Sequence, residues 1–394
     1  MVAITLDGST GGGQMLRFAL AFSILTKKPF KMIKIRAARP KPGIAHQHLF
    51  AIRACQQLSN AKVQGAELGS TELLFIPGAS PHVTDPKQKQ LRHVRVVLPT
   101  AGSLTLLLQS LLPLVATGKK SSTFLLAGGT DVPFSMPYAY VEHVLFWHLR
   151  PWMQITSMMH RPGFYPEGGG LLELKIKPLY EHAHDAPPLV VGYPTQLVLI
   201  KVLLLATAQA KPFAERMQEL LSVSLQQRYH VPVQAVVHIP SASSSFPSSF
   251  ADMQVQAQPK YQQPMLSATV IGIANQRCYS LGSRACSPSS QHPANAFGDP
   301  NPLLLAQGAD ALFSPLPQTP ELACKQLLTR IDFFSVDLHL LDNLVPYLFL
   351  FGGSMPAATS PHIETGIFVG KAFFETEPAI HDGFFVLDPT KKCT

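Results

Sequence analysis

Residues 2–26 read VAITLDGSTGGGQMLRFALAFSILT, and this stretch sets the structural pattern for the rest of the chain. Val2–Leu6 has the composition of a short strand, Gly11–Gly13 is a glycine run, and the apolar residues Gln14–Thr26 predict a helix. A strand, a glycine turn and a helix start together offer free N–H groups and the positive end of a helix dipole to a phosphate. The run does not have the Walker spacing, however, and on its own it is better explained by a tight turn that needs glycine.

The same kind of order continues along the chain. After the first helix the pattern predicts a strand, a helix and two more strands, at Phe30–Ala37, about His46–Leu58, Lys62–Leu68 and Glu72–Pro77. A similar order recurs between Val94 and Ile176, and a third pass is expected from about Pro320 to the end, with helices near Pro320–Phe334 and Leu338–Phe351. We therefore expect an α/β (α+β) fold in which three βαβαββ-type units form a large domain, because each half-covered sheet needs neighbours to bury its open face.

A stretch of different character separates the second and third units. It contains a predicted strand at Gln196–Thr207, a predicted helix at Pro212–Tyr229 and a Ser- and Pro-rich segment, Ser241–Phe250, that predicts a loop. A second such loop is predicted at Ser287–Pro302. We expect this stretch to be an inserted small α/β domain. The predicted boundaries are residues 1–182 for the first two units, 183–286 for the insert and 287–394 for the third unit.

The composition is that of a basic globular protein. Of 394 residues, 46% are hydrophobic and 14% are charged, and 32 Lys and Arg against 24 Asp and Glu give a formal net charge of +8. This balance favours polyanions such as nucleic acids and nucleotides. Five cysteines without a C-x-x-C pair argue against a zinc or redox site. The most apolar runs are shorter than the ~20 residues of a membrane span. We expect a cytoplasmic protein with no membrane partner.

A basic stretch, IRAARPKPGIAHQHL, spans Ile35–Leu49. It places three cations within six residues and then a helix start with two polar side chains: Arg36, Arg39 and Lys41, followed by Gln47 and His48. Guanidinium groups suit phosphate oxygens, and glutamine and histidine can hydrogen-bond to ribose or phosphate. The alternative is a solvated basic loop without a ligand.

Two isolated polar residues are further candidates. Gln109 lies in the otherwise apolar segment Thr100–Pro113, where a buried amide serves either as a structural hydrogen bonder or as a ligand contact. His362 lies in SPHIETGIF, and a single histidine is more often structural than catalytic. The turn-rich segments Gly128–Pro133 and Arg161–Gly170 are, taken alone, more typical of loops than of sites.

Taken together, these segments resemble the RNA 3′-terminal phosphate cyclase family. The most specific pieces are IRAARPKPG with HQHL, GAELGSTELLFIPG and GFYPEGGG, which occur in the right order; the resemblance is nearly absent in the insert. It implies a large domain of three βαβαββ-type units, with a small α/β domain inserted before or within the third. It also implies a reaction that uses ATP and a divalent metal, Mg²⁺ or Mn²⁺, to convert an RNA 3′-phosphate end into a 2′,3′-cyclic phosphate.

The resemblance also implies residue roles. The family's nucleophile lies in an H-x-x-T pattern, which falls here on His362 to Thr365 and would carry AMP covalently. The residues expected at the nucleotide are Gln109, His339, Leu340, Leu341, Asp342 and Asn343, together with Gln14 and Arg17 at the glycine turn. The residues expected at the RNA end are Arg36, Arg39, Lys41, Gln47 and His48. The family usually has a tyrosine where this chain has His339, and an imidazole can also stack on adenine.

One departure from the family pattern concerns the metal. The family's glycine loop usually carries a glutamate, whereas residues 8–14 of this chain, GSTGGGQ, contain no carboxylate, so the metal ligands stay open, with Asp131 or Asp342 as nearby carboxylates. Two alternatives to the cyclase also stay open. One is a non-catalytic family member that binds RNA in ribosome biogenesis, and the other is an enolpyruvyl transferase, whose repeat is similar.

Overall fold

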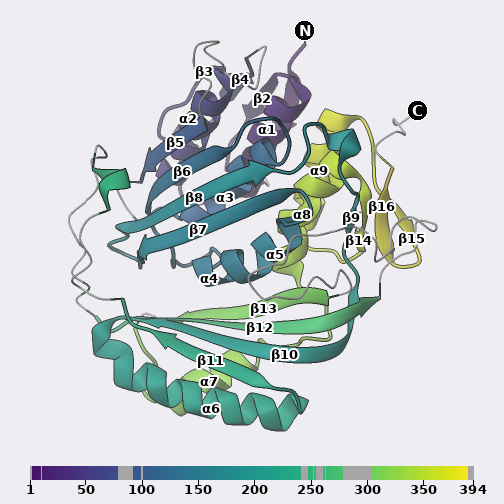
Figure 1. The fold of residues 1–394 in the computed structure, drawn as a ribbon. Coiled ribbons are helices and arrows are strands. Elements are labelled where there is room, and N and C mark those ends of the chain that lie inside the picture. Colours follow the sequence, from purple (N-terminus) through teal and green to yellow (C-terminus); the bar gives the residue numbers. More distant parts are fainter. Residues whose placement is uncertain are drawn as a thin grey trace.

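The structure is a computed structural model, and it describes residues 2–9, 11–78, 92–98, 101–240, 247–251, 253, 261, 263–277, 304–313 and 315–388. The predicted loop Ser287–Pro302 and most of the predicted loop Ser241–Phe250 lie outside the described residues. In the described part the fold is mixed α/β, with helices packed against four four-stranded sheets (Figure 1). None of the helices described is long and apolar enough to cross a membrane.

The first sheet forms around the N-terminal glycine turn. Its elements are β1 (Ile4–Asp7), α1 (Gly13–Thr26), β2 (Phe30–Ile33), α2 (His46–Ser59), β3 (Lys62–Gln64) and β4 (Leu73–Ile76). The strand order is β1-β2-β4-β3, with β1 and β2 parallel and the other neighbours antiparallel. Strand β2 ends at Ile33, short of the predicted Ala37, because Lys34 and Arg36 take left-handed φ angles of 52° and 54° that turn the chain.

The second sheet repeats this arrangement. Its strands are β5 (Arg92–Val97), β6 (Ser122–Gly128), β7 (Met153–Arg161) and β8 (Gly170–Pro178), in the order β5-β6-β8-β7. Again the first two strands are parallel and the others antiparallel. Its helices are α3 (Leu104–Leu111), which a 3-10 turn extends over Leu112–Val115, and the continuous helical segment α4 (Tyr138–Tyr140), π-helical Val141–Leu145 and α5 (Phe146–Leu149).

The third sheet has the same strand order and directions, but its first strand comes from an unexpected part of the chain. Its elements are β9 (Leu189–Val190), α8 (Leu338–Phe351), β14 (Gly353–Pro356), α9 (Pro361–Phe374), β15 (Ala379–His381) and β16 (Phe384–Leu387). Strands β9 and β14 are parallel, and β14, β16 and β15 follow as antiparallel neighbours. Since β9 lies within the predicted insert 183–286, we propose that the third unit begins before the insertion.

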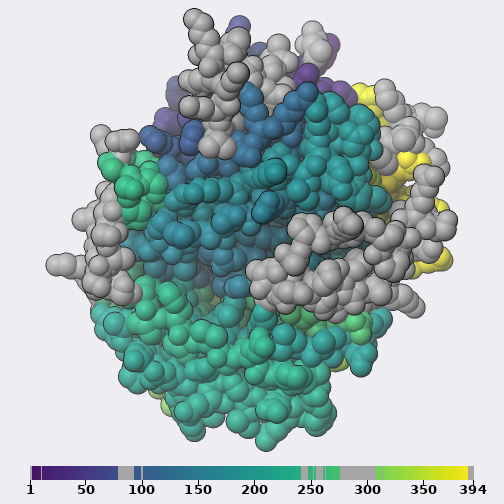
Figure 2. Space-filling view, in the orientation of Figure 1, coloured from purple at the N-terminus to yellow at the C-terminus, as the bar shows by residue number. Residues whose placement is uncertain are grey.

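The fourth sheet and two helices form a separate small unit, which Figure 2 shows directly below the residues of the second sheet. Its elements are β10 (Tyr193–Ala206), α6 (Lys211–Tyr229), β11 (Val233–His238), β12 (Leu266–Arg277), β13 (Leu304–Phe313) and α7 (Pro320–Leu328). The strand order is β11-β10-β12-β13, and a hydrophobic core of its own runs from Leu197 to Phe333. Strand β13 and helix α7 therefore pack with the insert, whereas the sequence predicted them in the third unit. We propose that the insert begins near residue 193 and ends near residue 334. Short 3-10 turns complete the fold at Ala183–Asp185, Ala208–Ala210 and Ser248–Phe250.

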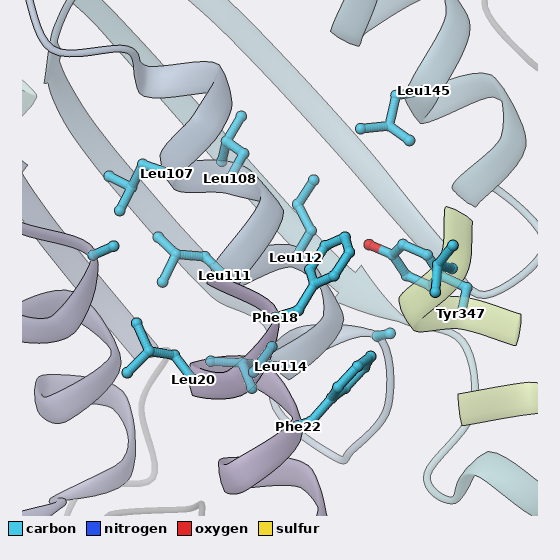
Figure 3. Packing of buried hydrophobic residues seen from close by; sticks show 14 of the residues in the cluster. Phe18, Leu20, Phe22, Leu107, Leu108, Leu111, Leu112, Leu114, Leu145 and Tyr347 are labelled. Atoms are coloured by element: carbon cyan, nitrogen blue, oxygen red, sulfur yellow. The ribbon is translucent and has the colours of Figure 1, made fainter. Parts of the chain in front are cut away.

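The main core lies where α1, α3 and α8 meet. Figure 3 shows Phe18 and Phe22 of α1 facing leucines of α3, with Tyr347 of α8 close by. Phe18 and Phe22 are fully buried, and so is Leu108. Full burial of such side chains contributes roughly 1.5–3 kcal/mol each. The core therefore fixes the three helices against one another, and with them the residues at their ends.

Helix α9 packs onto this core through two glycines. His362, Gly366 and Gly370 follow one another at four-residue spacing and so lie on one face of α9. A Cβ atom on Gly366 would lie 2.8 Å from Phe18 Cε2, and one on Gly370 would lie 2.5 Å from Phe349 Cδ2. The absence of side chains at these positions lets α9 approach α1 and α8 closely, and this close approach places His362 beside the first turn of α1.

We predict that Gly370→Ala destabilises the protein by about 1–3 kcal/mol, because the added methyl group overlaps the ring of Phe349 in a closely packed interface. The measurement is the free energy of unfolding by denaturant titration. The matched control is Phe368→Ala, which changes a side chain on the exposed face of the same helix and should shift the value by no more than about 0.5 kcal/mol. Equal unfolding curves for Gly370→Ala and the unchanged protein would contradict the close-packing account.

Candidate active site

The first turns of four helices converge at one place. The ring of His362, at the start of α9, hydrogen-bonds through Nδ1 to Oε1 of Gln14, at the start of α1. A Cβ atom on Gly13, the first residue of α1, would lie 2.9 Å from Cδ2 of His48, near the start of α2. His339, at the start of α8, acts electrostatically on His362. Because each helix start carries unpaired N–H groups and partial positive charge, this convergence suits a polyanion.

Backbone hydrogen bonds hold the basic stretch against the glycine turn. The N–H groups of Arg36 and Ala38 donate to the carbonyls of Gly8 and Ser9, at 3.0 and 3.2 Å. The side chain of Arg36 folds back, and its Nη1 donates to the Gly43 carbonyl at 3.0 Å. Arg39 is exposed, and its Nη2 lies 3.6 Å from the position that a Cβ on Gly12 would occupy. The glycine turn and the basic stretch therefore lie side by side.

His48 is a buried, neutral donor that faces the glycine turn. Its Nδ1 accepts a hydrogen bond from the N–H of Ala45 at 3.1 Å, so the proton of the neutral ring is on Nε2. Burial, reinforced by the positive charges of Arg17 and Arg36, lowers the pKa of His48 to about 3. The Nε2 atom is buried and has no hydrogen-bond partner among the described residues. Such an orphaned donor beside a glycine turn is what an anion would satisfy.

A buried chain of amide hydrogen bonds connects α1, α3 and α8. The Nε–H of Arg17 donates to Gln109 Oε1 at 2.7 Å, and Gln109 Nε2 donates to Asn343 Oδ1 at 2.8 Å. The Nδ2 of Asn343 in turn donates to the carbonyl of His339 at 2.6 Å and to Asp342 Oδ1 at 2.7 Å. Gln109 is thus a structural hydrogen bonder that fixes the Arg17 guanidinium; direct contact of Gln109 with a nucleotide stays a prediction.

The guanidinium of Arg17 is buried close to one carboxyl group. Burial lowers the pKa of Arg17 to about 10, and the neighbouring Asp342 opposes that shift. Burial raises the pKa of Asp342 to about 8, against the opposing charge of Arg17. Burial therefore disfavours the ionised form of both groups, and their mutual attraction opposes this effect. Arg17 and Arg39 also act electrostatically on His362, and Arg17 and Arg36 on His48, so the surroundings are basic, as an anion requires.

The orientation of Gln14 assigns a tautomer to His362, and the surroundings favour the neutral ring. Because Gln14 Oε1 only accepts, the proton of the neutral ring is on Nδ1, and the lone pair is on Nε2. The loss of hydration at this position, together with the positive charge of Arg17, His339 and Arg39, lowers the pKa of His362. The hydroxyl of Ser360 accepts from the N–H of Ile363 at 3.1 Å and so caps the helix that carries the ring. The ring of His362 is exposed, and its Nε2 has no hydrogen-bond partner among the residues that the structure describes.

Several predicted residues lie apart from this cluster. The side chains of Leu340 and Leu341 are buried in the main hydrophobic core, so only their backbone borders the site. Lys41 is exposed and Gln47 is half-buried, and in the described ranges neither is hydrogen-bonded to the residues above. The structure thus brings together Gln14, Arg17, Arg36, Arg39, His48, Gln109, His339, Asp342, Asn343 and His362.

Asp337 is a residue that the sequence analysis missed. Its Oδ1 accepts from the N–H of Leu340 at 3.0 Å and caps α8. Its Oδ2 accepts from the hydroxyl of Tyr140 at 2.5 Å and from the N–H of Gly308 in β13 at 2.9 Å. Asp337 therefore joins the large domain, the small unit and the helix that carries Asn343. An aspartate directly before an apolar helix is a recognisable cap signal, but its two other partners are not visible in the sequence.

The metal-ligating side chains in the described part of the chain do not form a cluster. In the ranges that the structure describes, no group of three or more His, Cys, Asp or Glu side chains is placed to hold a metal ion. The buried carboxyl of Asp131 accepts from the hydroxyl of its neighbour Thr130 at 2.7 Å, and that of Asp342 from Asn343. The described residues therefore do not form a metal site by themselves.

Comparison with known proteins agrees with this geometry. The family model described as "RNA 3′-terminal phosphate cyclase" matches residues 9–380. A protein of that name from Pyrococcus furiosus is 33% identical over 94% of this chain and 93% of its own length, and one from Thermococcus onnurineus is 33% identical over 96% of both. One from Thermococcus kodakarensis is 46% identical over 45% of this chain and 50% of its own length. The chain therefore belongs to the RNA 3′-terminal phosphate cyclase family.

Proposed function

We propose that this protein converts an RNA 3′-phosphate end into a 2′,3′-cyclic phosphate with ATP, and that His362 carries AMP covalently between the two substrates. The observation that carries the proposal is the neutral ring of His362, whose free Nε2 lies where four helix starts converge. A neutral imidazole is a competent nucleophile at phosphorus, and its adduct is reactive enough to pass the group on.

The surroundings of the ring fit a triphosphate. Arg17 and Arg39 act on His362 electrostatically, and Arg36 lies on the same loop as Arg39. The Nε2–H of His48 and the amide Nε2 of Gln14 are buried donors without a partner among the described residues. Phosphoryl-type transfer needs positioning and charge neutralisation more than it needs covalent chemistry. These groups would supply both to the pyrophosphate that leaves.

The proposed reaction has three displacements at phosphorus. Nε2 of His362 attacks the α-phosphorus of ATP, forms a P–N bond and expels pyrophosphate. An oxygen of the RNA 3′-phosphate then attacks the same phosphorus, so that the P–N bond breaks and AMP joins the RNA end. Finally the neighbouring ribose 2′-hydroxyl attacks the RNA phosphorus, loses its proton and expels AMP. A DNA end has no 2′-hydroxyl and would stop after the second step.

A second candidate is a non-catalytic family member that binds RNA. The glycine loop without a carboxylate favours it, together with the lack of a metal-ligand set in the described ranges. It predicts RNA binding without a covalent adduct, so the labelling experiment below separates the two functions. No observation on the structure favours an enolpyruvyl transferase, which would not need a covalent histidine.

Incubation with α-labelled ATP and Mg²⁺ or Mn²⁺ is expected to leave acid-labile label on the denatured chain, because a P–N bond to imidazole forms. His362→Ala should lower the labelling roughly 10³-fold or more, since the nucleophile is removed. His184→Ala, which changes an exposed histidine outside the site, should label like the unchanged protein. Absence of label would favour the second candidate, whereas label that persists in His362→Ala would show that another residue carries AMP; either result would refute the role of His362.

The imidazole of His362 is expected to titrate below pH 6.5, its ordinary pKa, because desolvation and the charge of Arg17 disfavour the protonated ring. More than half of the rings would then be neutral, and so nucleophilic, at pH 6.5. The measurement is the NMR shift of the ring against pH, assigned by its loss in His362→Asn. Arg17→Gln removes a neighbouring charge and should move the midpoint upward. A midpoint at or above pH 6.5 in the unchanged protein would refute this account.

A further inference from the structure

One aromatic side chain is held in solvent by a strained backbone. Phe134 follows the segment Gly128–Pro133, its side chain has a relative exposure of 102%, and its φ angle is +64°. The left-handed region is unfavourable for a bulky side chain, because Cβ crowds the following carbonyl. Neither burial nor backbone preference therefore explains the position of this ring. Strained backbone conformations of this kind are found most often at active sites and ligand-binding sites.

The loop around Phe134 is fixed on both sides. Ahead of it, the N–H groups of Thr130 and Asp131 both donate to the carbonyl of Gly163, at 2.8 and 3.1 Å. The hydroxyl of Ser135 donates to the carbonyl of Val132 at 2.9 Å and closes the turn. These hydrogen bonds fix the backbone of the loop and so maintain the strained conformation of Phe134. Because the loop is already ordered, binding a ligand to the ring would cost little conformational entropy.

The same loop borders the active site. Met136, two residues beyond Phe134, has its Sδ 3.5 Å from Nδ2 of Asn343, and its carbonyl accepts from the hydroxyl of Thr105 at 2.8 Å. Two residues of chain span at most about 7 Å. Asp310 of β13 interacts electrostatically both with His339 at the start of α8 and with Asp131, which precedes Phe134 on the loop. The backbone of Phe134 therefore lies close to the first turns of α8, which carry His339 and Asn343.

We propose that Phe134 is a stacking platform for an unpaired base within the last few nucleotides of the RNA. This inference rests on the proposed function. The face of a phenyl ring takes the face of any base, and stacking of this kind depends little on sequence. The phosphates would meet Arg17, Arg36 and Arg39, and the base would meet Phe134, so that two kinds of interaction together position the end of the strand.

A flat nucleobase fits this ring better than a protein surface does. On this loop Val132 and Met136 are buried and Pro133 is exposed beside Phe134, so the loop itself adds little apolar surface to the ring. A specific protein interface needs a contiguous patch with a buried centre. Single-stranded nucleic acids, in contrast, are commonly held by separate aromatic rings near cationic groups.

The test uses the full-length protein and a short RNA that ends in a 3′-phosphate and carries 2-aminopurine as its penultimate base. The unchanged protein should bind this RNA and quench the 2-aminopurine fluorescence through stacking. Phe134→Ala should bind about tenfold more weakly, within the range expected for one base–aromatic stack, and should lose the quenching. Phe134→Trp should keep both. Phe334→Ala, which changes another exposed phenylalanine, is the matched control and should bind like the unchanged protein.

Phe134→Gly separates a role in binding from a role in folding. Glycine accepts the left-handed backbone, so this variant should unfold at the same or a higher temperature, yet bind RNA as weakly as Phe134→Ala. Equal RNA affinity in Phe134→Ala and the unchanged protein would overturn the proposal, and this is also the result expected if the ring docks a protein. Labelling by ATP alone reports the His362 chemistry without RNA, so a failure of the proposed function is seen separately.

Discussion

The close packing of α9 against α1 and α8 is the constraint on which the site depends. Gly366 and Gly370 have no side chain to separate the helices, and the rings of Phe18 and Phe349 occupy the space where a Cβ would lie. His362 lies on the same face of α9, one turn before Gly366, so the packing of the core determines where its ring stands. The ring of His362 is thus positioned by apolar contacts made one and two turns further along α9.

Burial then sets the protonation of the groups that meet there. Partly desolvated surroundings and neighbouring positive charge favour neutral His48 and His362, while Arg17 keeps its charge. The buried guanidinium of Arg17 would be costly alone, but Gln109 accepts from its Nε and Asp342 lies nearby. The same low-dielectric setting that makes the imidazole neutral also strengthens the attraction of an anion for Arg17.

Asp337 links this site to the rest of the fold. One carboxyl oxygen caps α8, and the other joins Tyr140 of the large domain to Gly308 in β13 of the small unit. A shift of the small unit would therefore act on the first turn of α8, which carries His339 and Asn343.

The role expected for His362 in the H-x-x-T motif came from the resemblance to the family, because a single histidine is more often structural. Local pattern in the sequence was enough for the element order of the first two units, the glycine turn and the basic stretch, since each depends on residues close together in the chain. It was not enough for the partners of β9, β13 and α7, because strand and helix pairing across long intervals depends on how whole surfaces pack. It also left the role of Gln109 open. Only the tertiary structure shows that its amide oxygen accepts from Arg17 and its amide nitrogen donates to Asn343, which lie 92 and 234 residues away in the chain. Such contacts leave no periodic trace in the sequence, because the fold alone brings their partners together.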